Sequence, residues 1–306
     1  MTSSTVRWGY GAGTAVTSVQ QALAEALWAE AAGFDSFWIS QMSGVDPIVA
    51  CAAIGERAAG LTEMGTSVVP LTGRHPLALA ASAATAASAT GNRFTLGIGP
   101  SHKIVAEGMY GESFDRPFAR TAEFVHCLNA LFETGSVQHG GDHIVANGTL
   151  TVEADPPPLL LAALGPRMLA FAGAHAAGTS VGQCGPKTIA SHIAPLIREA
   201  AAEAGRPDPR IVALVNICVT SDRHGAIEAA RPGSAMYGSL PSYRRMLDIE
   251  GVDDAVDLVL IGSPDEVGDR LGQYVESGAT DLRVGIATQD PQDRAATKSF
   301  LESFVA

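Results

Sequence analysis

Apolar runs rich in β-branched and aromatic residues recur through the first third of the chain, with starts 28 to 30 residues apart. They occupy residues 6–10, 36–40, 65–69 and 93–99. The segments between them have helical periodicity, clearest at 17–32, where Leu23, Ala26, Leu27 and Ala31 share one face. Thr17 or Ser18 can cap the start of this helix, and Gly33 can end it. Strands and helices that alternate at this spacing are typical of βαβ units and a parallel sheet.

Four more strand candidates follow, at 159–164, 179–183, 210–220 and 281–287. The first four are compatible with either a doubly wound sheet or a closed barrel, and a total of eight favours the barrel. The length of 306 residues suits this fold, which takes about 250 residues and more with insertions. We therefore predict a single α/β domain over 1–306, folded as a (β/α)8 TIM barrel.

Two segments interrupt the repeat, near 100–157 and 222–256. Within the first, residues 136–151 are typical of a hairpin, with Gly140-Gly141 as its turn. Within the second, residues 231–251 are expected to be helical or irregular. The run Pro156-Pro157-Pro158 is interpreted as a stiff lead-in to the fifth strand, because proline cannot donate to a sheet ladder.

Charge and composition exclude several classes of function. A formal net charge of −12 repels nucleic acid and anionic membrane surfaces, so neither is an expected partner. The N-terminus lacks the basic and apolar regions of a secretory signal, and no apolar stretch reaches a membrane-spanning length, so we expect a cytoplasmic protein that acts on a small molecule. The four cysteines lie far apart without zinc-ligand spacing, which predicts reduced thiols and no metal site.

Glycine and proline gather where the predicted strands end, which in a barrel is where function belongs. The first strand runs into Gly11, the fourth into Gly99-Pro100-Ser101, and the fifth into Gly165-Pro166-Arg167. Missing Cβ atoms would let a flat ring or a phosphate approach the backbone, although tight βα loops alone account for any one of these places. Helices that begin after Gly165-Pro166 and after Gly185-Pro186 would point free N–H groups at an anion.

Known nucleotide and nucleophile motifs are missing. The chain has no GxGxxG at a strand-to-helix turn, no GxxxxGK[ST] and no GxSxG, which argues against Rossmann dehydrogenases, P-loop NTPases and α/β-hydrolases. Histidine suits proton transfer near neutral pH. His102 would be either a proton donor at the barrel mouth or an exposed loop residue, and His75 is expected to pack its loop rather than line the mouth. His139 and His143, in the predicted hairpin, are expected to have surface roles.

Several longer stretches resemble a known superfamily. Residues 29–38 (AEAAGFDSFW), 65–70 (GTSVVP) and 93–99 (RFTLGIG) together are similar to luciferase-like monooxygenases. Within that superfamily, residues 74–80 (RHPLALA), 97–102 (GIGPSH) and 160–168 (LLAALGPRM) resemble an actinobacterial group of oxidoreductases that depend on the deazaflavin coenzyme F420. The likeness covers nearly the whole chain.

The resemblance implies a (β/α)8 barrel with insertions and a cofactor at the strand ends. It implies a non-prolyl cis peptide at Ser67-Val68, supporting the back face of the deazaflavin ring. It also implies that the phosphate and tail of the cofactor lie against Gly165 and Pro166, with the Gly185 turn nearby. A homodimer is expected because relatives commonly pair through barrel helices.

One departure from the family pattern affects the expected reaction. The F420-dependent sugar-phosphate dehydrogenases have Asp-His after the second strand, where this chain has Gln41-Met42, and their carboxylic proton donor aligns with His102. We therefore do not transfer the sugar-phosphate activity. The resemblance implies hydride transfer between the deazaflavin C5 and a C=C, C=N or C=O group, with His102 as proton donor and Gln41 as a polarising group. The alternatives are an FMN-dependent monooxygenase of the same fold and a flavin-binding protein without catalytic activity.

Overall fold

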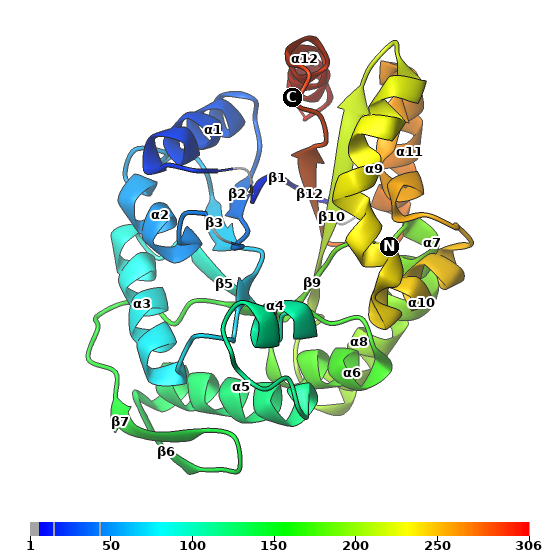
Figure 1. Ribbon diagram of the computed structural model, residues 1–306. Coiled ribbons are helices and arrows are strands. Elements are labelled where there is room, and N and C mark those ends of the chain that lie inside the picture. Colours follow the sequence, from blue (N-terminus) through cyan, green and yellow to red (C-terminus); the bar gives the residue numbers. More distant parts are fainter. Residues whose placement is uncertain (1–5, 15, 43, 306) are drawn as a thin grey trace.

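The computed structural model describes residues 6–14, 16–42 and 44–305, in which eight parallel strand positions close on themselves as a barrel (Figure 1). Neighbours pair in chain order, and the last strand returns to the first. The strands are β1 (Arg7–Gly13), β2 (Ser36–Ile39), β3 (Glu63–Thr66), β5 (Phe94–Gly99), β8 (Leu159–Leu161), β9 (Gly178–Val181), β10 (Arg210–Val219) and β12 (Asp281–Ile286). This confirms the predicted (β/α)8 barrel and excludes the doubly wound sheet.

Two short strands modify the barrel. β4 (Val69–Pro70) continues the third strand position after a break at Ser67 and Val68, and it pairs with β5. β11 (Leu260–Gly262) was not among the predicted strands, and it pairs with the far end of β10 at Ile217–Val219. The same edge of β10 pairs with β9 lower down, at Arg210–Ala213. β11 therefore extends the barrel wall toward its C-terminal rim, where β9 has already ended.

Helices surround the barrel on the outside (Figure 1). They are α1 (Val19–Ala31), α2 (Pro47–Ile54), α3 (Pro76–Ala89), α4 (Lys103–Gly108), α5 (Pro117–Thr134), α6 (Pro166–His175), α7 (Pro186–Thr188), the π-helical turn η1 (Ile189–Ile193), α8 (Ala194–Glu203), α9 (Arg223–Ser239), α10 (Pro241–Glu250), the 3-10 turn η2 (Ala255–Leu258), α11 (Pro264–Glu276) and α12 (Pro291–Val305). Many begin with proline, whose missing N–H would have no partner in a first turn.

The predicted ends of the first helix are confirmed. The Ser18 hydroxyl accepts a hydrogen bond from the Gln21 N–H at the start of α1. Gly33 follows its end with φ of 88°, a left-handed conformation that favours glycine. The predicted hairpin is also confirmed, as β6 (Ser136–Gly140) and β7 (Val145–Thr149) pair antiparallel and lie beside α5. The second interruption is largely helical, in α9 and α10.

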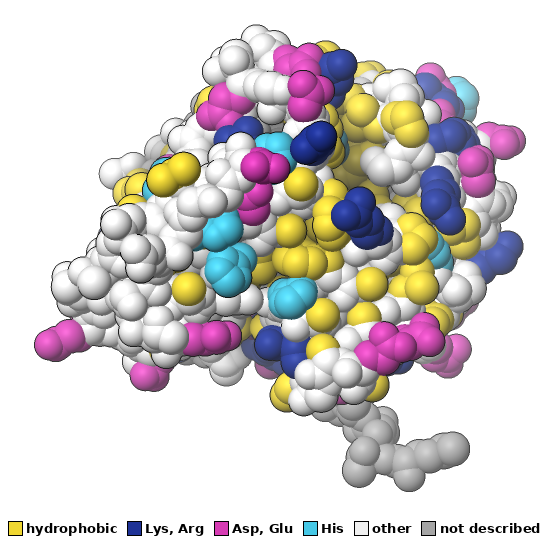
Figure 2. Space-filling model, turned by 90° about the horizontal axis from the view of Figure 1, so that it is seen from below, with side chains coloured by type: hydrophobic (Ala, Val, Ile, Leu, Met, Phe, Trp, Pro, Cys, Tyr) yellow, Lys and Arg dark blue, Asp and Glu magenta, His cyan; other side chains and the backbone are white. Residues whose placement is uncertain are grey.

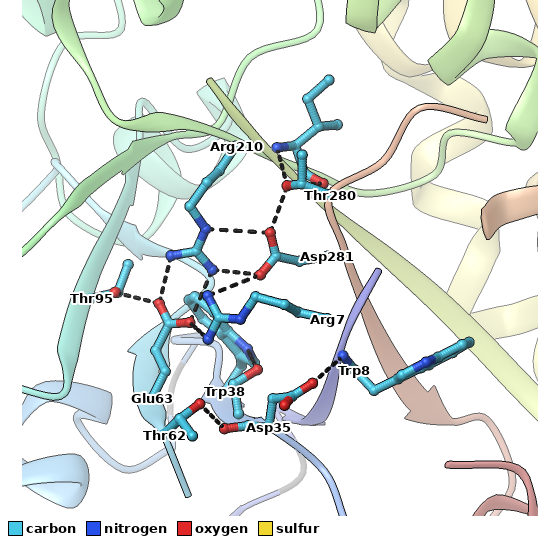
Figure 3. Close-up of polar contacts among 12 residues, drawn as sticks. Arg7, Trp8, Asp35, Trp38, Thr62, Glu63, Thr95, Arg210, Thr280 and Asp281 are labelled. Atoms are coloured by element: carbon cyan, nitrogen blue, oxygen red, sulfur yellow. Dashed lines mark hydrogen bonds and ion pairs between the residues drawn. The ribbon is translucent and has the colours of Figure 1, made fainter. Parts of the chain in front are cut away.

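The N-terminal ends of the strands meet in a buried ion-pair network (Figure 3). Arg210 reaches Glu63 at 2.7 Å and Asp281 at 2.6 Å, and Arg7 reaches Glu63 at 2.7 Å. These four residues are the first residues of β10, β3, β12 and β1. The network therefore closes one end of the barrel, and the opposite end is left for a ligand.

Within the described part of the chain, no helix is both long and apolar enough to cross a lipid bilayer. The four cysteines are all buried and free, as predicted.

Candidate active site

A cavity of about 360 Å³ opens at the C-terminal end of the barrel. Its wall is built from the ends of successive strands and from the helices of the second insertion. The predicted residues that line it are Gly11, Gln41, Ser67, Val68, Gly99, Ser101 and His102. Residues scattered over the first hundred positions are therefore brought together by the parallel strands that carry them.

The floor of the cavity contains the segment between β3 and β4. The Ser67–Val68 peptide bond is cis, as predicted. The Ser67 carbonyl accepts hydrogen bonds from the Ser40 hydroxyl and, at 2.8 Å, from the Arg283 guanidinium. The Ser67 hydroxyl lies 2.6 Å from the Ser180 hydroxyl on β9. Contacts to the loop after β2, to β9 and to β12 thus fix this segment, while Val68 lines the cavity.

The strand-end glycines make room for side chains of the protein itself. A Cβ on Gly11 would lie 3.1 Å from Cγ of Arg283, and a Cβ on Gly99 would lie 3.1 Å from both Val68 Cγ2 and Ala162 Cβ. The missing Cβ atoms therefore leave room for protein side chains at both positions, and contact of Gly11 and Gly99 with a ligand stays a prediction. Gly11 and Gly99 still line the cavity, and what they accommodate is its floor.

His102 stands at the cavity wall as the N-cap residue of α4, and its side chain makes no capping hydrogen bond. Its ring centroid lies 5.6 Å from that of Tyr243. Burial lowers the pKa of His102 below its ordinary value, because the charged imidazolium is poorly solvated there. The ring is therefore mainly neutral at neutral pH and has a nitrogen free to accept a proton.

Gln41 lines the cavity from the loop after β2 and is held by a charged neighbour. Arg74 donates to the Gln41 side-chain oxygen at 2.7 Å and to Asp46 at 2.6 Å. The amide oxygen is thereby engaged, which leaves the amide N–H₂ as the group able to face a ligand. Met42 lies beside it at the rim with 40% of its surface exposed.

The cavity residues that sequence reasoning missed include three with side chains able to donate hydrogen bonds to a ligand, two tyrosines and an arginine. Tyr237 on α9 and Tyr243 on α10 contact each other edge to face, with ring centroids 4.9 Å apart, and both line the cavity. Burial raises the pKa of both phenols, so they stay protonated and can donate hydrogen bonds. Arg283 on β12 is the third, and its position between the apolar residues Leu282 and Val284 of a strand was a readable signal.

A second, more open hollow of about 460 Å³ adjoins the cavity and shares Ser101 and His102 with it. It holds the remaining predicted positions around the start of α6: Pro100, Gly165, Pro166 and Arg167. A Cβ added to Gly165 would meet nothing within 4 Å, so this helix start is open. The Arg167 guanidinium stacks on the Phe118 ring at 3.8 Å.

Gly185 does not belong to this set. The helix that follows it begins against the Glu250 carboxylate of α10, which accepts hydrogen bonds at 2.7 Å from both the N–H and the hydroxyl of Thr188. A Cβ on Gly185 would lie 2.1 Å from Cδ of Glu250. The anion position predicted at this turn is thus filled by the chain's own carboxylate, and we remove Gly185 from the cofactor contacts.

The other histidines lie away from the cavity. His75 caps α3 by accepting from the Leu77 N–H and lies 2.9 Å from the Val145 carbonyl of β7, which agrees with packing of its loop. Figure 2 shows histidines gathered on the face formed by α5, α6 and the hairpin. The rings of His126 and His139 lie near each other, with centroids 5.2 Å apart and planes tilted by 52°. The described residues contain no group of histidine, cysteine and acidic side chains arranged to hold a metal ion.

Comparison with known proteins identifies the family. The model of the luciferase-like monooxygenase family matches residues 1–281. A Mycobacterium tuberculosis protein named as a candidate coenzyme F420-dependent oxidoreductase is 30% identical over 79% of this chain and 77% of its own length. An F420-dependent glucose-6-phosphate dehydrogenase of Mycolicibacterium smegmatis is 27% identical over 90% of this chain and 91% of its own.

A solved structure supports the fold. The structure of an F420-dependent secondary alcohol dehydrogenase, in complex with an F420-acetone adduct, covers 99% of both chains with a TM-score of 0.82 and 21% identity. The chain therefore belongs to the luciferase-like monooxygenase family and is an oxidoreductase of that family.

Proposed function

We propose that this oxidoreductase uses coenzyme F420 and transfers a hydride between the C5 atom of the deazaflavin ring and a C=C, C=N or C=O group of a small organic substrate. The observation that carries the proposal is the combination of the cis Ser67–Val68 bond with His102 in the wall of one strand-end cavity. The F420-dependent names of relatives at 27% and 30% identity support it.

The form of the cavity and of its neighbouring hollow supports the proposal. Val68 offers an apolar floor to a flat ring, and the volume of about 360 Å³ lies in the usual range of roughly 300–1,000 Å³ for ligand pockets. The open start of α6 at Gly165 and Pro166, with Arg167 beside it, would receive the anionic tail. When bound, the deazaflavin supplies the hydride acceptor or donor at C5.

The chain's own residues then orient the reactants and handle the proton. Tyr237 and Tyr243 cover the cavity from the insertion and exclude water from it. His102 accepts a proton from the substrate when the substrate is oxidised and returns it in the reverse direction. Because its pKa is lowered, the neutral form of His102, which accepts the proton in the oxidation direction, prevails at neutral pH.

Cofactor identity is tested by titrating the purified protein with F420 and with FMN while following fluorescence. We expect binding of F420 and a clear preference for it over FMN. A preference for FMN would instead support the alternative, an FMN-dependent monooxygenase of the same fold. Tight F420 binding without turnover on a broad panel of ketones, enones and imines would support a flavin-binding protein without catalytic activity.

The pH dependence of turnover tests the state of His102. With its pKa lowered, oxidation should keep full activity at neutral pH and fall only as the pH drops through that pKa, where the ring becomes protonated. The rate of reduction should show the opposite dependence and decline as the pH rises through the pKa of His102. Measuring kcat/KM in both directions from pH 4.5 to 8.5 gives the two limbs. An acid limb of the oxidation above pH 6.5 would contradict the assignment.

A further inference from the structure

Arg283 is a charged residue in a cavity that otherwise has no permanent charge. Among the described residues that line the cavity there is no aspartate, glutamate or lysine. The Arg283 side chain comes from the middle of β12 and is buried, with 4% of the residue exposed. A guanidinium remains protonated in proteins, so this end of the cavity is positive.

The hydrogen-bonding capacity of this guanidinium is largely unused by the part of the chain that the structure describes. Nη1 donates to the Ser67 carbonyl at 2.8 Å and to the Ser40 hydroxyl at 3.4 Å. Among the residues that the structure describes, the buried Nε has no hydrogen-bond partner, and none is found for Nη2. A buried charge without a counter-ion is costly, and a buried donor without an acceptor adds to the cost.

The nearest acid along the strand does not serve as the counter-ion. Asp281, two residues earlier on β12, is engaged by Arg210 at 2.6 Å and by Arg7 at 3.5 Å in the network at the opposite end of the barrel. Arg283 forms no ion pair among the described residues, in contrast to Arg7 and Arg210. The positive charge is therefore available to a molecule that enters the cavity.

Neutral hydrogen-bond donors lie around the same end of the cavity. Tyr237 of α9 and Asn216 of β10 line it together with Arg283, and Asn216 pairs in register with Gly285, two residues beyond Arg283. A guanidinium with neutral donors near it suits a carboxylate, which accepts several charge-assisted hydrogen bonds at once.

We propose that Arg283 binds an oxyanion of the substrate, so that the enzyme acts on a small organic acid. The inference rests on the proposed function for the reaction itself, and it adds the substrate class. Arg283 would hold the carboxylate while the reacting carbon lies within reach of the ring and of His102. Its bond to the Ser67 carbonyl would remain and keep the guanidinium in place.

Binding of simple carboxylates to the purified protein tests this without knowledge of the natural substrate. The probes are benzoate and acetate, each compared with its neutral amide, by calorimetry with and without saturating F420. We expect each carboxylate to bind at least about tenfold tighter than its amide, and to bind together with F420. Equal affinity of acid and amide for the wild-type protein would overturn the proposal. Exclusion of F420 by the acids would also overturn it, because Arg283 would then be a cofactor contact.

Variants test whether Arg283 is the source of the preference for the acid over the amide. Arg283→Met should abolish the preference for the acid over the amide, and Arg283→Lys should keep part of it. Arg223→Met, which removes an equal charge from an exposed position on α9, should leave it unchanged. If Arg283→Met fails to fold, the acid and amide affinities of the wild-type protein and of Arg283→Lys still test the proposal. Benzoate binding without F420 binding would reject the proposed function and retain the anion site. F420 binding without a preference for the acid would retain the proposed function and reject the anion site.

Discussion

Replacing Glu63 with alanine is expected to lower the free energy of unfolding by about 3–5 kcal/mol. The Glu63 side chain is 7% exposed and is shared by Arg210 at 2.7 Å and Arg7 at 2.7 Å. Without it, the two guanidinium groups would have Asp281 as their remaining acidic partner in this network. The cost is large because it leaves uncompensated buried charge, and it can be measured by urea unfolding followed by circular dichroism.

Two further variants separate this explanation from a general effect of removing an acid. Asp248→Ala removes an exposed partner of Arg244 on α10 and should cost at most about 0.5 kcal/mol. Glu63→Leu combined with Arg210→Met should lower the free energy of unfolding clearly less than the sum of the two single variants. Each single change leaves the charge of the other residue without its partner, whereas the double change removes both charges. Additive costs would show that the network is not the reason for the loss.

The same carboxyl links stability to acid pH. Burial alone would raise the pKa of Glu63, but the hydrogen bond and charge of Arg210, helped by Arg7 and Thr95, hold it below its ordinary value. A carboxyl with a lowered pKa stabilises the fold at pH values above about 4.3, its ordinary value, and this stabilisation is lost as the pH falls through the folded-state pKa. In Glu63→Gln, the free energy of unfolding should therefore fall less steeply than in the wild-type protein as the pH is lowered.

The barrel could be predicted from the sequence because its repeat is periodic. Each predicted barrel strand supplies an apolar run, and helical segments such as α1 lie between the runs, so the repeat is readable without a structure. β11 could not be predicted in this way, because Leu260–Gly262 lies outside the eight-unit repeat and its pairing with β10 depends on where β9 ends. Local patterns therefore define the elements, while their lengths at the rim depend on tertiary contacts.

The site was only partly predictable, for a different physical reason. Position at a strand end placed His102 at the cavity that it lines, and the family resemblance placed Ser67 and Val68 there. Glycine was a poorer guide, because an absent Cβ does not say whether a ligand or a side chain such as that of Arg283 fills the space. Gly185 failed as a cofactor contact because Glu250, 65 positions later, reaches the same helix start. Long-range competition for a binding position is not visible in a local motif.

His102 can be distinguished from a residue that only shapes the cavity, because the structure offers a matched control. His102 and His75 are both N-cap residues of helices that follow barrel strands, at α4 and α3. His102 lines the cavity, whereas His75 lies outside it and contacts β7. His75 caps its helix with its side chain and His102 does not, so any loss of turnover confined to His102→Ala cannot come from the loss of a cap.

His102→Ala is expected to lower turnover by about 10² or more, the usual effect of losing a general acid or base, which corresponds to roughly 2.7 kcal/mol in the activation barrier. F420 affinity should stay within about threefold, because Val68 and the start of α6 are untouched. His75→Ala should leave turnover unchanged and reduce only stability. The measurement is the single-turnover rate from deazaflavin absorbance, on whichever ketone, enone or imine the substrate panel identifies. If His102→Ala turns over at the wild-type rate, the proton must come from water or from the substrate, and His102 only shapes the wall beside Tyr243.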